Sequence, residues 1–138
     1  MSIRETAIAA LHSRLVTALA VRNPAPLVLR GEAIPQRIPA GGLVVLRDGE
    51  AVEETPILSP LAWQVEHRVE VEITVAGGTP AARNTLLDAL LVDVAAAIAA
   101  NRTLSGAVEW AQPGSASFED VEFEGAAAAR AAAIPVTL

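Results

Sequence analysis

The chain lacks cysteine, lysine and tyrosine. Without cysteine, its 138 residues have no disulfide bond, no thiol nucleophile and no Cys-based metal site. Long apolar runs are also missing. Although 52% of the residues are hydrophobic, no run approaches the roughly 20 apolar residues of a membrane span. The opening "MSIRETAIAALHSRL" carries charges throughout, so we expect no secretory signal. These absences are compatible with a cytoplasmic protein.

Positive charge is scarce as well. Ten arginines stand against sixteen acidic residues, which gives a formal net charge of −6. Nucleic-acid binding needs a basic patch for the phosphates, so this composition disfavours it. Two acidic runs, "GEAVEE" at 49–54 and "FEDVEFE" at 118–124, are typical of solvated surface. A chain of this length predicts one domain, 1–138, with its own core.

Two segments have the pattern of amphipathic helices. The first begins after Ser2, which has capping-box spacing with Glu5, and extends over 3–21 until Asn23-Pro24 ends it. The second spans about 80–100, with Thr79 as its N-cap. Apolar residues at helical spacing predict one buried face for each helix: Ile8, Leu11, Leu15 and Leu19, then Leu87, Leu90, Leu91, Val94 and Ile98.

The stretch "WQVEHRVEVEITV", residues 63–75, alternates apolar and polar residues. This period of two predicts a long central strand with one dry face and one wet face. The Asp48-Gly49 dipeptide predicts a tight hairpin turn before it. Two prolines, Pro56 and Pro60, predict a bend or bulge in the returning chain. Shorter strands are expected at 27–30, 43–50 and 107–111, and near Val121.

The tail "GAAAARAAAIPVTL" is compatible with two structures. Alanine favours a helix, whereas Pro135 and the β-like "IPVTL" favour a strand at the edge of the sheet. We adopt the edge strand as the prediction. The order of elements then predicts an α+β fold. It would have a mainly antiparallel or mixed sheet of four to five strands, with two helices packed on one face.

No residue pattern predicts a catalytic, cofactor-binding or metal site. The two histidines, His12 and His67, have neither metal-motif spacing nor a recognisable nucleophile to activate. Since His67 is on the dry side of 63–75, we expect it to be largely buried. Trp63 and Trp110 are expected in the core or at an interface. We therefore expect a protein that is not an enzyme and binds no cofactor.

The ordered pieces resemble a known family. These are "RETAIAALHSRL", "IPAGGLVVLRDGE", "LSPLAWQVEHRVEVEITV", "LLDALLVDVAAAIAANRTL" and the tail "GAAAARAAAIPVTL". Over nearly the whole chain they resemble the tail-terminator proteins of long-tailed phages, the U-like minor tail proteins. They look most similar to versions in tail modules of alphaproteobacterial gene transfer agents and related prophages. Some proteins of this appearance carry an acyl-transferase label, which no residue here supports.

The resemblance implies a structural function. Tail terminators are similar to tail-tube proteins: α+β subunits that form a six-membered ring, cap the finished tube and offer their other surface to the head-side connector. The implied partners are further copies of the chain, the tube protein and the connector. DNA would pass without specific binding, and no membrane would be involved. The implied location is the virion tail, or the bacterial cytoplasm during assembly. The alternative is a small soluble α+β enzyme or ligand-binding domain.

The resemblance also suggests that the sheet lines the channel and the helices lie outside. The wet face of 63–75 would then turn Glu66, Glu70 and Glu72 toward passing DNA, whose phosphates these carboxylates would repel. The other interpretation is a plain solvated strand, as on many antiparallel sheets. Both interpretations remain open at this point.

The segment 50–61 is a candidate partner contact through Glu53, Glu54, Ile57 and Leu58. It is too apolar to be merely solvated and too interrupted by proline for an ordinary hairpin. We expect it to be mobile in the free subunit and to become ordered against the tube, the connector or a neighbouring copy.

Overall fold

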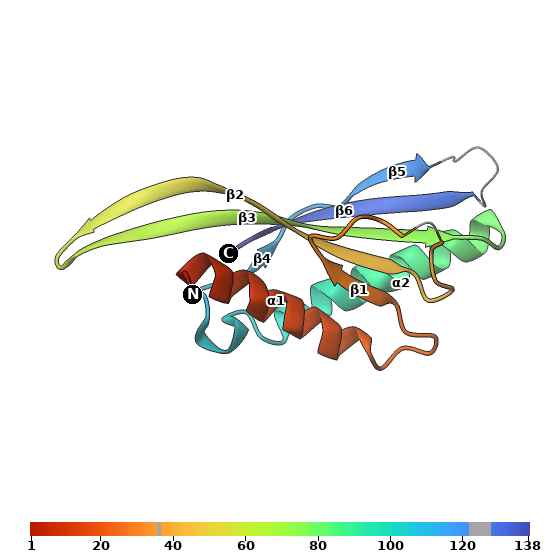
Figure 1. Ribbon diagram of the computed structural model, residues 1–138, viewed down its shortest axis with the longest axis horizontal. Coiled ribbons are helices and arrows are strands. Elements are labelled where there is room, and N and C mark those ends of the chain that lie inside the picture. Colours follow the sequence, from red (N-terminus) through yellow and green to blue (C-terminus); the bar gives the residue numbers. More distant parts are fainter. Residues whose placement is uncertain (36, 122–127) are drawn as a thin grey trace.

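The computed structural model describes residues 1–35, 37–121 and 128–138. These residues form two α-helices and a six-stranded mixed sheet, which confirms the α+β fold (Figure 1). Neither helix is both long and apolar enough to cross a membrane. The elements are α1 (Ile3–Leu19), β1 (Leu27–Arg30), β2 (Leu43–Leu58), β3 (Leu61–Ala76), α2 (Pro80–Ala99), β4 (Gln112–Pro113), β5 (Ser117–Val121) and β6 (Ala129–Thr137).

Strand β3 is the centre of the sheet, as its alternation predicts. The strand order is β1-β2-β3-β6, and both β4 and β5 pair with the outer edge of β6. Only β1 and β2 run parallel; the other neighbours are antiparallel. Strand β2 accompanies β3 almost from end to end, whereas β6 pairs with it only from Arg68 to Ala76.

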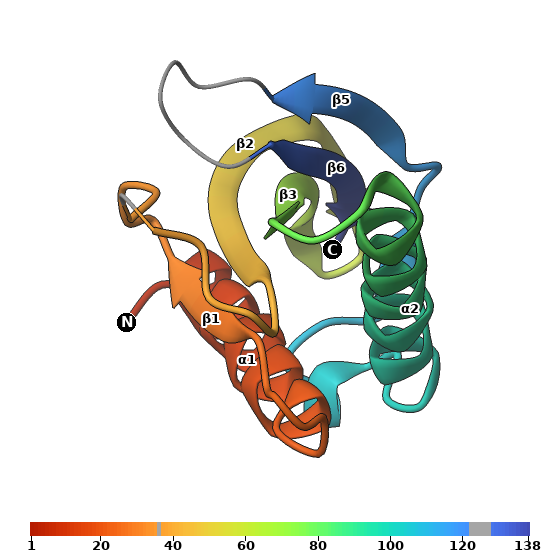
Figure 2. The ribbon, with the colours of Figure 1, turned by 90° about the vertical axis from the view of Figure 1, so that its right-hand side faces the viewer.

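Both helices pack on one face of the sheet, which is the predicted arrangement (Figures 1 and 2). Each begins at its predicted cap: the hydroxyl groups of Ser2 and Thr79 accept N–H bonds of 3.1 Å from the first turns. Burial of aliphatic side chains between the layers drives this packing. The core contains Leu11 and Leu15 of α1, Leu90 and Val94 of α2, and Val69, Val71, Ile73 and Val75 of β3.

The alanine-rich tail is a strand, but its predicted place at the edge of the sheet is wrong. Strand β6 lies between β3 on one side and β4 with β5 on the other. Alternate residues, including Ala132 and Ile134, are buried in the core. Hydrogen-bonded partners on both sides outweigh the low strand propensity of alanine, which is a weak and context-dependent preference.

The predicted turn at Asp48-Gly49 is wrong. The two residues form a bulge inside β2, where the pairing with β3 shifts register between Arg47 and Glu50. The chain turns instead at Ser59-Pro60. The positive φ of Gly49, 61°, suits a bulge as well as a tight turn. The local signal was therefore real, but it does not distinguish the two structures.

The predicted strand at 107–111 is also wrong. The chain there forms turns after a short 3-10 segment, Leu104–Gly106, and β4 begins only at Gln112. Backbone and side chain of Arg102 both bond Ala111, which closes this segment into a loop. The strand expected near Val121 is confirmed as β5, and the rest of the second acidic run lies outside the described residues.

We predict that Gly49→Ala destabilises the protein more than Gly31→Ala. The two glycines have nearly the same positive φ, 61° and 62°. Both substitutions therefore incur the left-handed strain of about 1–2 kcal/mol. A Cβ at Gly31 meets open space, whereas one at Gly49 overlaps the carbonyl oxygen of Arg68. Urea unfolding of both variants measures the difference; equal losses of unfolding free energy would contradict the role of the bulge.

Candidate functional site

Strands β2 and β3 continue beyond the rest of the sheet as a two-stranded arm (Figure 1). We define the arm as residues 50–66. Its neighbours stop at the root: β1 leaves β2 at Leu46, and β6 leaves β3 at Arg68. Every arm residue is exposed except Glu66, which is partly buried. Apart from a long bond of 3.4 Å that Gln64 donates to Glu109, the arm is held by its own ladder, and nothing in the described chain buries it.

The segment 50–61, predicted to be too interrupted by proline for an ordinary hairpin, forms most of a paired hairpin. Pro56 sits within β2, opposite Trp63. Proline cannot donate to a ladder, so strands tolerate it at an edge where no second neighbour needs its N–H. That condition holds here, because no described residue pairs with the outer side of β2 along the arm. Pro56 therefore marks an edge strand, where the sequence predicted a bend or bulge, and the bulges of β2 lie earlier, between Arg47 and Glu53.

One face of the arm is apolar. Residues that pair across the two strands share a face, and so do residues two apart along one strand. The pairs Leu58–Leu61 and Pro56–Trp63 therefore lie on one face, together with Val65. Leu58, Leu61 and Trp63 are 81%, 71% and 63% exposed. We call Pro56, Leu58, Leu61, Trp63 and Val65 the apolar arm face. The alternation that buries β3 thus continues beyond the helices, so Trp63 and Val65 lie outside the core.

The other side of the arm is mostly polar and acidic. Glu53 lies directly opposite Glu66, and like charges in that position repel. The four residues predicted as a partner contact all lie on the arm, but on two faces. Glu54 and Leu58 belong to the side of Trp63, while Glu53 and Ile57 belong to the other. With Glu50, the arm carries four carboxylates and no arginine.

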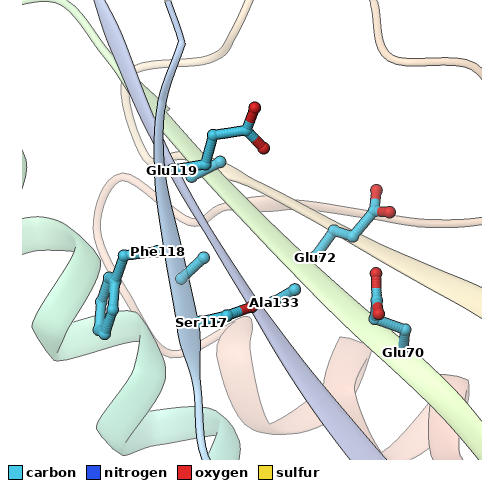
Figure 3. A pocket seen from close by; sticks show the side chains of 8 residues that line it. Glu70, Glu72, Ser117, Phe118, Glu119 and Ala133 are labelled. Atoms are coloured by element: carbon cyan, nitrogen blue, oxygen red, sulfur yellow. The ribbon is translucent and has the colours of Figure 1, made fainter.

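The predicted acidic stripe is divided in the structure. Glu66 belongs to the arm, whereas Glu70 and Glu72 lie on the helix-free face of the sheet. Glu72 forms an ion pair with Arg47 at 3.2 Å. Figure 3 shows Glu119 of β5 beside Glu70 and Glu72, around a shallow hollow of about 200 Å³ that Ala133 helps to line. We call Glu70, Glu72 and Glu119 the acidic face.

Sequence reasoning missed Glu119 as a member of the acidic face. It lies in the run "FEDVEFE", which we had interpreted as solvated surface. The two carboxylates of β3 and the one of β5 meet because β6 brings these strands within one strand of each other. Strand order is a long-range property, so only the acidic run itself could have indicated this residue.

An arginine clamp holds the root of the arm to the body. The guanidinium of Arg30 in β1 donates two bonds to the carboxylate of Glu5 in α1, at 2.7 and 2.8 Å. It donates two more to Asp48 in β2, each 2.9 Å. Arg30 hydrogen bonds lower the pKa of both carboxyls below their ordinary values, and the two carboxylates raise the pKa of Arg30. The clamp therefore joins three elements beside the bulge.

His67 completes the root from the opposite strand. Its side chain is buried, as predicted, with the residue only 8% exposed. The ring Nε2 contacts the carbonyl oxygen of Asp48, and its backbone pairs in both directions with Leu138. A structural role accounts for all of these contacts. His12 lies partly buried on α1, and the described residues contain no cluster of three potential metal-ligating side chains.

Trp110 is the second tryptophan outside the core. It is half exposed, with the guanidinium of Arg102 stacked 5.2 Å from its ring centroid. Its indole N–H donates to Gln112. Neither tryptophan therefore fills the space between the helices and the sheet, and both remain available at the surface.

The sequence matches no protein-family model and no curated protein. The geometry of the arm and of the acidic face, together with the family resemblance of the ordered segments, therefore carries the functional conclusion.

We predict that the contribution of the Arg30 clamp to the free energy of unfolding is lost at acidic pH. A carboxyl with a lowered pKa stabilises the fold above its ordinary pKa, here 4.5 for Glu5 and 3.8 for Asp48. That stability is lost as pH falls through the lowered values. Arg30→Gln should reduce the unfolding free energy at neutral pH, and the gap from the parent should narrow as pH falls below these ordinary values. Urea unfolding across this range measures the gap.

Arg14→Gln is the matched control, because Arg14 Nε donates to the backbone carbonyl of Ala97, which does not titrate. Its effect should be similar at both ends of the pH range. A gap for Arg30→Gln that stays constant on acidification would show that the clamp does not contribute through its carboxylates.

Proposed function

We propose that the chain is a tail-terminator subunit of a phage-like particle. Several copies would form a ring that caps the tail tube, stops its growth and joins the tail to the head-side connector. The uncovered arm carries this proposal. In a tail assembly the arm has a use, because a ring subunit must reach a neighbouring copy, the tube or the connector.

The exposed apolar side chains of the arm support an assembly function. A two-stranded hairpin alone is marginally stable in water, and this one exposes Leu58, Leu61 and Trp63 side by side. A contiguous apolar surface of this kind marks an interaction site or an aggregation hazard. A large aromatic residue beside leucines is also the composition of an interface centre. Covering this surface with a partner removes its contact with water.

The position of the acidic face supports a ring in which the helix-free side of the sheet faces the channel. Since both helices occupy one side of the sheet, the other side carries Glu70, Glu72 and Glu119. In a ring with the helices outside, this face would line the channel. Repeated carboxylates would repel the phosphates of passing DNA over roughly the 8 Å screening length of physiological salt. The proposed location is the virion tail.

We predict that a subunit without the arm folds but does not terminate tails. Replacing 51–65 with a short turn removes only exposed residues and leaves Arg30, Asp48 and His67 in place. The helices and the core should therefore remain, with an unchanged helical circular-dichroism signal per molecule. In particles, tails should become variable in length, as electron microscopy would measure.

A variant with Trp63 and Leu58 both changed to serine provides a less drastic control, since it keeps the backbone of the arm. It should reproduce the length defect if the apolar arm face makes the contact. Particles with tails of parental length in the arm-deletion variant would rule out the arm as the terminating contact.

We predict that Glu70→Lys combined with Glu119→Lys reduces DNA delivery without changing tail length. Both side chains are exposed on the helix-free face, so folding should change by only tenths of a kcal/mol per charge. Glu72 is left intact because it is paired with Arg47. A lysine-lined channel would attract phosphates, and more strongly at low salt.

The corresponding glutamine variant removes repulsion without adding attraction, so its defect should be milder. Transfer of a marker gene measures delivery, and electron microscopy of the same particles measures tail length. Parental delivery by the lysine variant would place the acidic face on the outside of the particle.

A further inference from the structure

The two edges of the arm differ. The outer edge of β2 is interrupted by Pro56 and by two register shifts near the root, and the extra residues of both shifts belong to β2. Such interruptions keep an exposed edge from pairing with another chain. The edge of β3 has no proline or glycine from Leu61 to Glu66, and β6 leaves it at Arg68. No described residue pairs with it there, and we call Leu61–Glu66 the open edge.

The open edge presents backbone donors and acceptors in a regular row. His67 directs both its N–H and its C=O to Leu138, on the side of β6. Because backbone groups alternate in direction along a strand, every second residue toward the tip faces the same side. These residues are Val65, Trp63 and Leu61. Pro56, opposite Trp63, agrees with this assignment, since it has no N–H to donate across the ladder.

The open edge is complementary to itself. When two copies approach antiparallel around a twofold axis at Trp63, that residue meets Trp63 of the second copy, and Leu61 meets Val65. Each outward-facing residue then exchanges both of its hydrogen bonds with an outward-facing residue of the other copy. Residues directly opposite each other share a face, so the two apolar arm faces join into one surface with the two indoles side by side.

Other registers satisfy fewer backbone groups. A shift of one residue opposes outward-facing to inward-facing residues and puts the two apolar arm faces on opposite sides of the sheet. A shift of two residues toward the root places Leu61 against His67, whose backbone groups already pair with Leu138. A shift of two residues toward the tip leaves Val65 facing the turn. The alternation of β3 and the end of β6 therefore select the register centred on Trp63.

Charge does not oppose this pairing, although the arm carries four carboxylates and no arginine. Glu50, Glu53 and Glu54 lie on β2, which is the outer strand of each arm. Two strand spacings or more, roughly 10 Å, separate them from every carboxylate of the other arm. This exceeds the screening length of about 8 Å in physiological salt. Glu66 meets the turn of the other arm, roughly 20 Å along the strand from its counterpart.

The body of the subunit leaves the backbone of the open edge free to pair. In the described chain, the hydrogen bond between arm and body side chains is the one from Gln64 to Glu109, at 3.4 Å. Both residues are exposed, and the bond is longer than an ordinary hydrogen bond. It involves side chains alone, so the outward-facing backbone groups of Trp63 and Val65 remain available to a second copy.

We infer that free subunits pair through the open edges of their arms, so that two arms form one four-stranded sheet around a twofold axis at Trp63. Such a contact uses the same surface on both partners and is complete with two copies. The inference goes beyond the proposed ring, because it concerns the subunit before assembly. Pairing closes an edge that would otherwise be a template for unrelated strands.

Single cysteines test the register directly, because the chain has no cysteine of its own. In the inferred pair, Ala62 lies opposite Gln64 of the second copy at a non-hydrogen-bonded position, with Cα atoms about 4.5 Å apart. This separation is within the range of disulfide bonds. Ala62→Cys protein mixed with Gln64→Cys protein should therefore form a disulfide-linked heterodimer under mild oxidation, which mass spectrometry measures.

Thr55→Cys is the matched control for Gln64→Cys. Thr55 pairs with Gln64 within one arm, so it lies in the same row one strand farther out. Its distance from Ala62 of the second copy is roughly 10 Å, which exceeds the limit of about 7 Å for a disulfide. All three positions are exposed. Mixing Ala62→Cys with Thr55→Cys should therefore give little heterodimer.

A proline at the open edge tests the backbone contact without any cysteine. Val65→Pro removes one outward N–H from each copy, hence two hydrogen bonds from the pair, and leaves the ladder with β2 intact. Self-association in analytical ultracentrifugation should weaken on the order of tenfold or more. Glu54→Pro is the control, because Glu54 lies opposite Val65 and its N–H faces the outer edge of β2. It should not weaken association.

Equal heterodimer yields with Gln64→Cys and Thr55→Cys, or a parent that stays monomeric, would overturn the inference. Val65→Pro protein that associates as strongly as the parent would also overturn it. Disulfides from Gln64→Cys to a cysteine-bearing tube protein, with none to Ala62→Cys, would assign the open edge to that partner instead. Variable tails in the arm-deletion variant, with no paired free subunit, would retain the proposed function and refute the pairing.

Discussion

The feature on which the rest of the structure depends is a mismatch of length between β3 and the helices that cover it. Sixteen residues of extended chain span roughly 53 Å. Twenty residues of α-helix, the length of α2, span about 30 Å. The apolar alternation of β3 nevertheless continues past His67 to Leu61. A strand that is apolar over more length than its own core can cover must expose the remainder, and that remainder is the arm.

At the root of the arm, where the packed core ends, charged hydrogen bonds hold the chain in place. At the bulge, Arg30 makes four hydrogen bonds to two carboxylates on different elements. Guanidinium suits this position because its rigid fork serves two bidentate partners at once. The clamp sits at the point where β1 has just ended and β2 loses its outer neighbour. Charge pairing thus replaces the sheet contact that the strand loses there.

Local signals in the sequence were sufficient for the helices and for β3. Ser2, Thr79 and Pro80 indicated the helix starts, and strict alternation indicated the central strand. The errors arose where one local signal serves two structures. Asp48-Gly49 suits a turn or a bulge, and only pairing with residues far along the chain decides between them. The wrong edge position for β6 and the failure to identify Glu119 have the same cause. Neighbouring residues do not determine the order of strands in the sheet.

The geometry of the root also determines where the tip of the arm lies. From Glu50 to Leu58 the arm extends roughly 30 Å. On a lever of that length, a rotation of about 5° at the root displaces the tip by nearly 3 Å, which is the length of a hydrogen bond. Small errors at Gly49 or Asp48 are therefore magnified where Leu58 meets another surface. Substitutions at the root would move the contact, whereas substitutions at the tip would only change its chemistry.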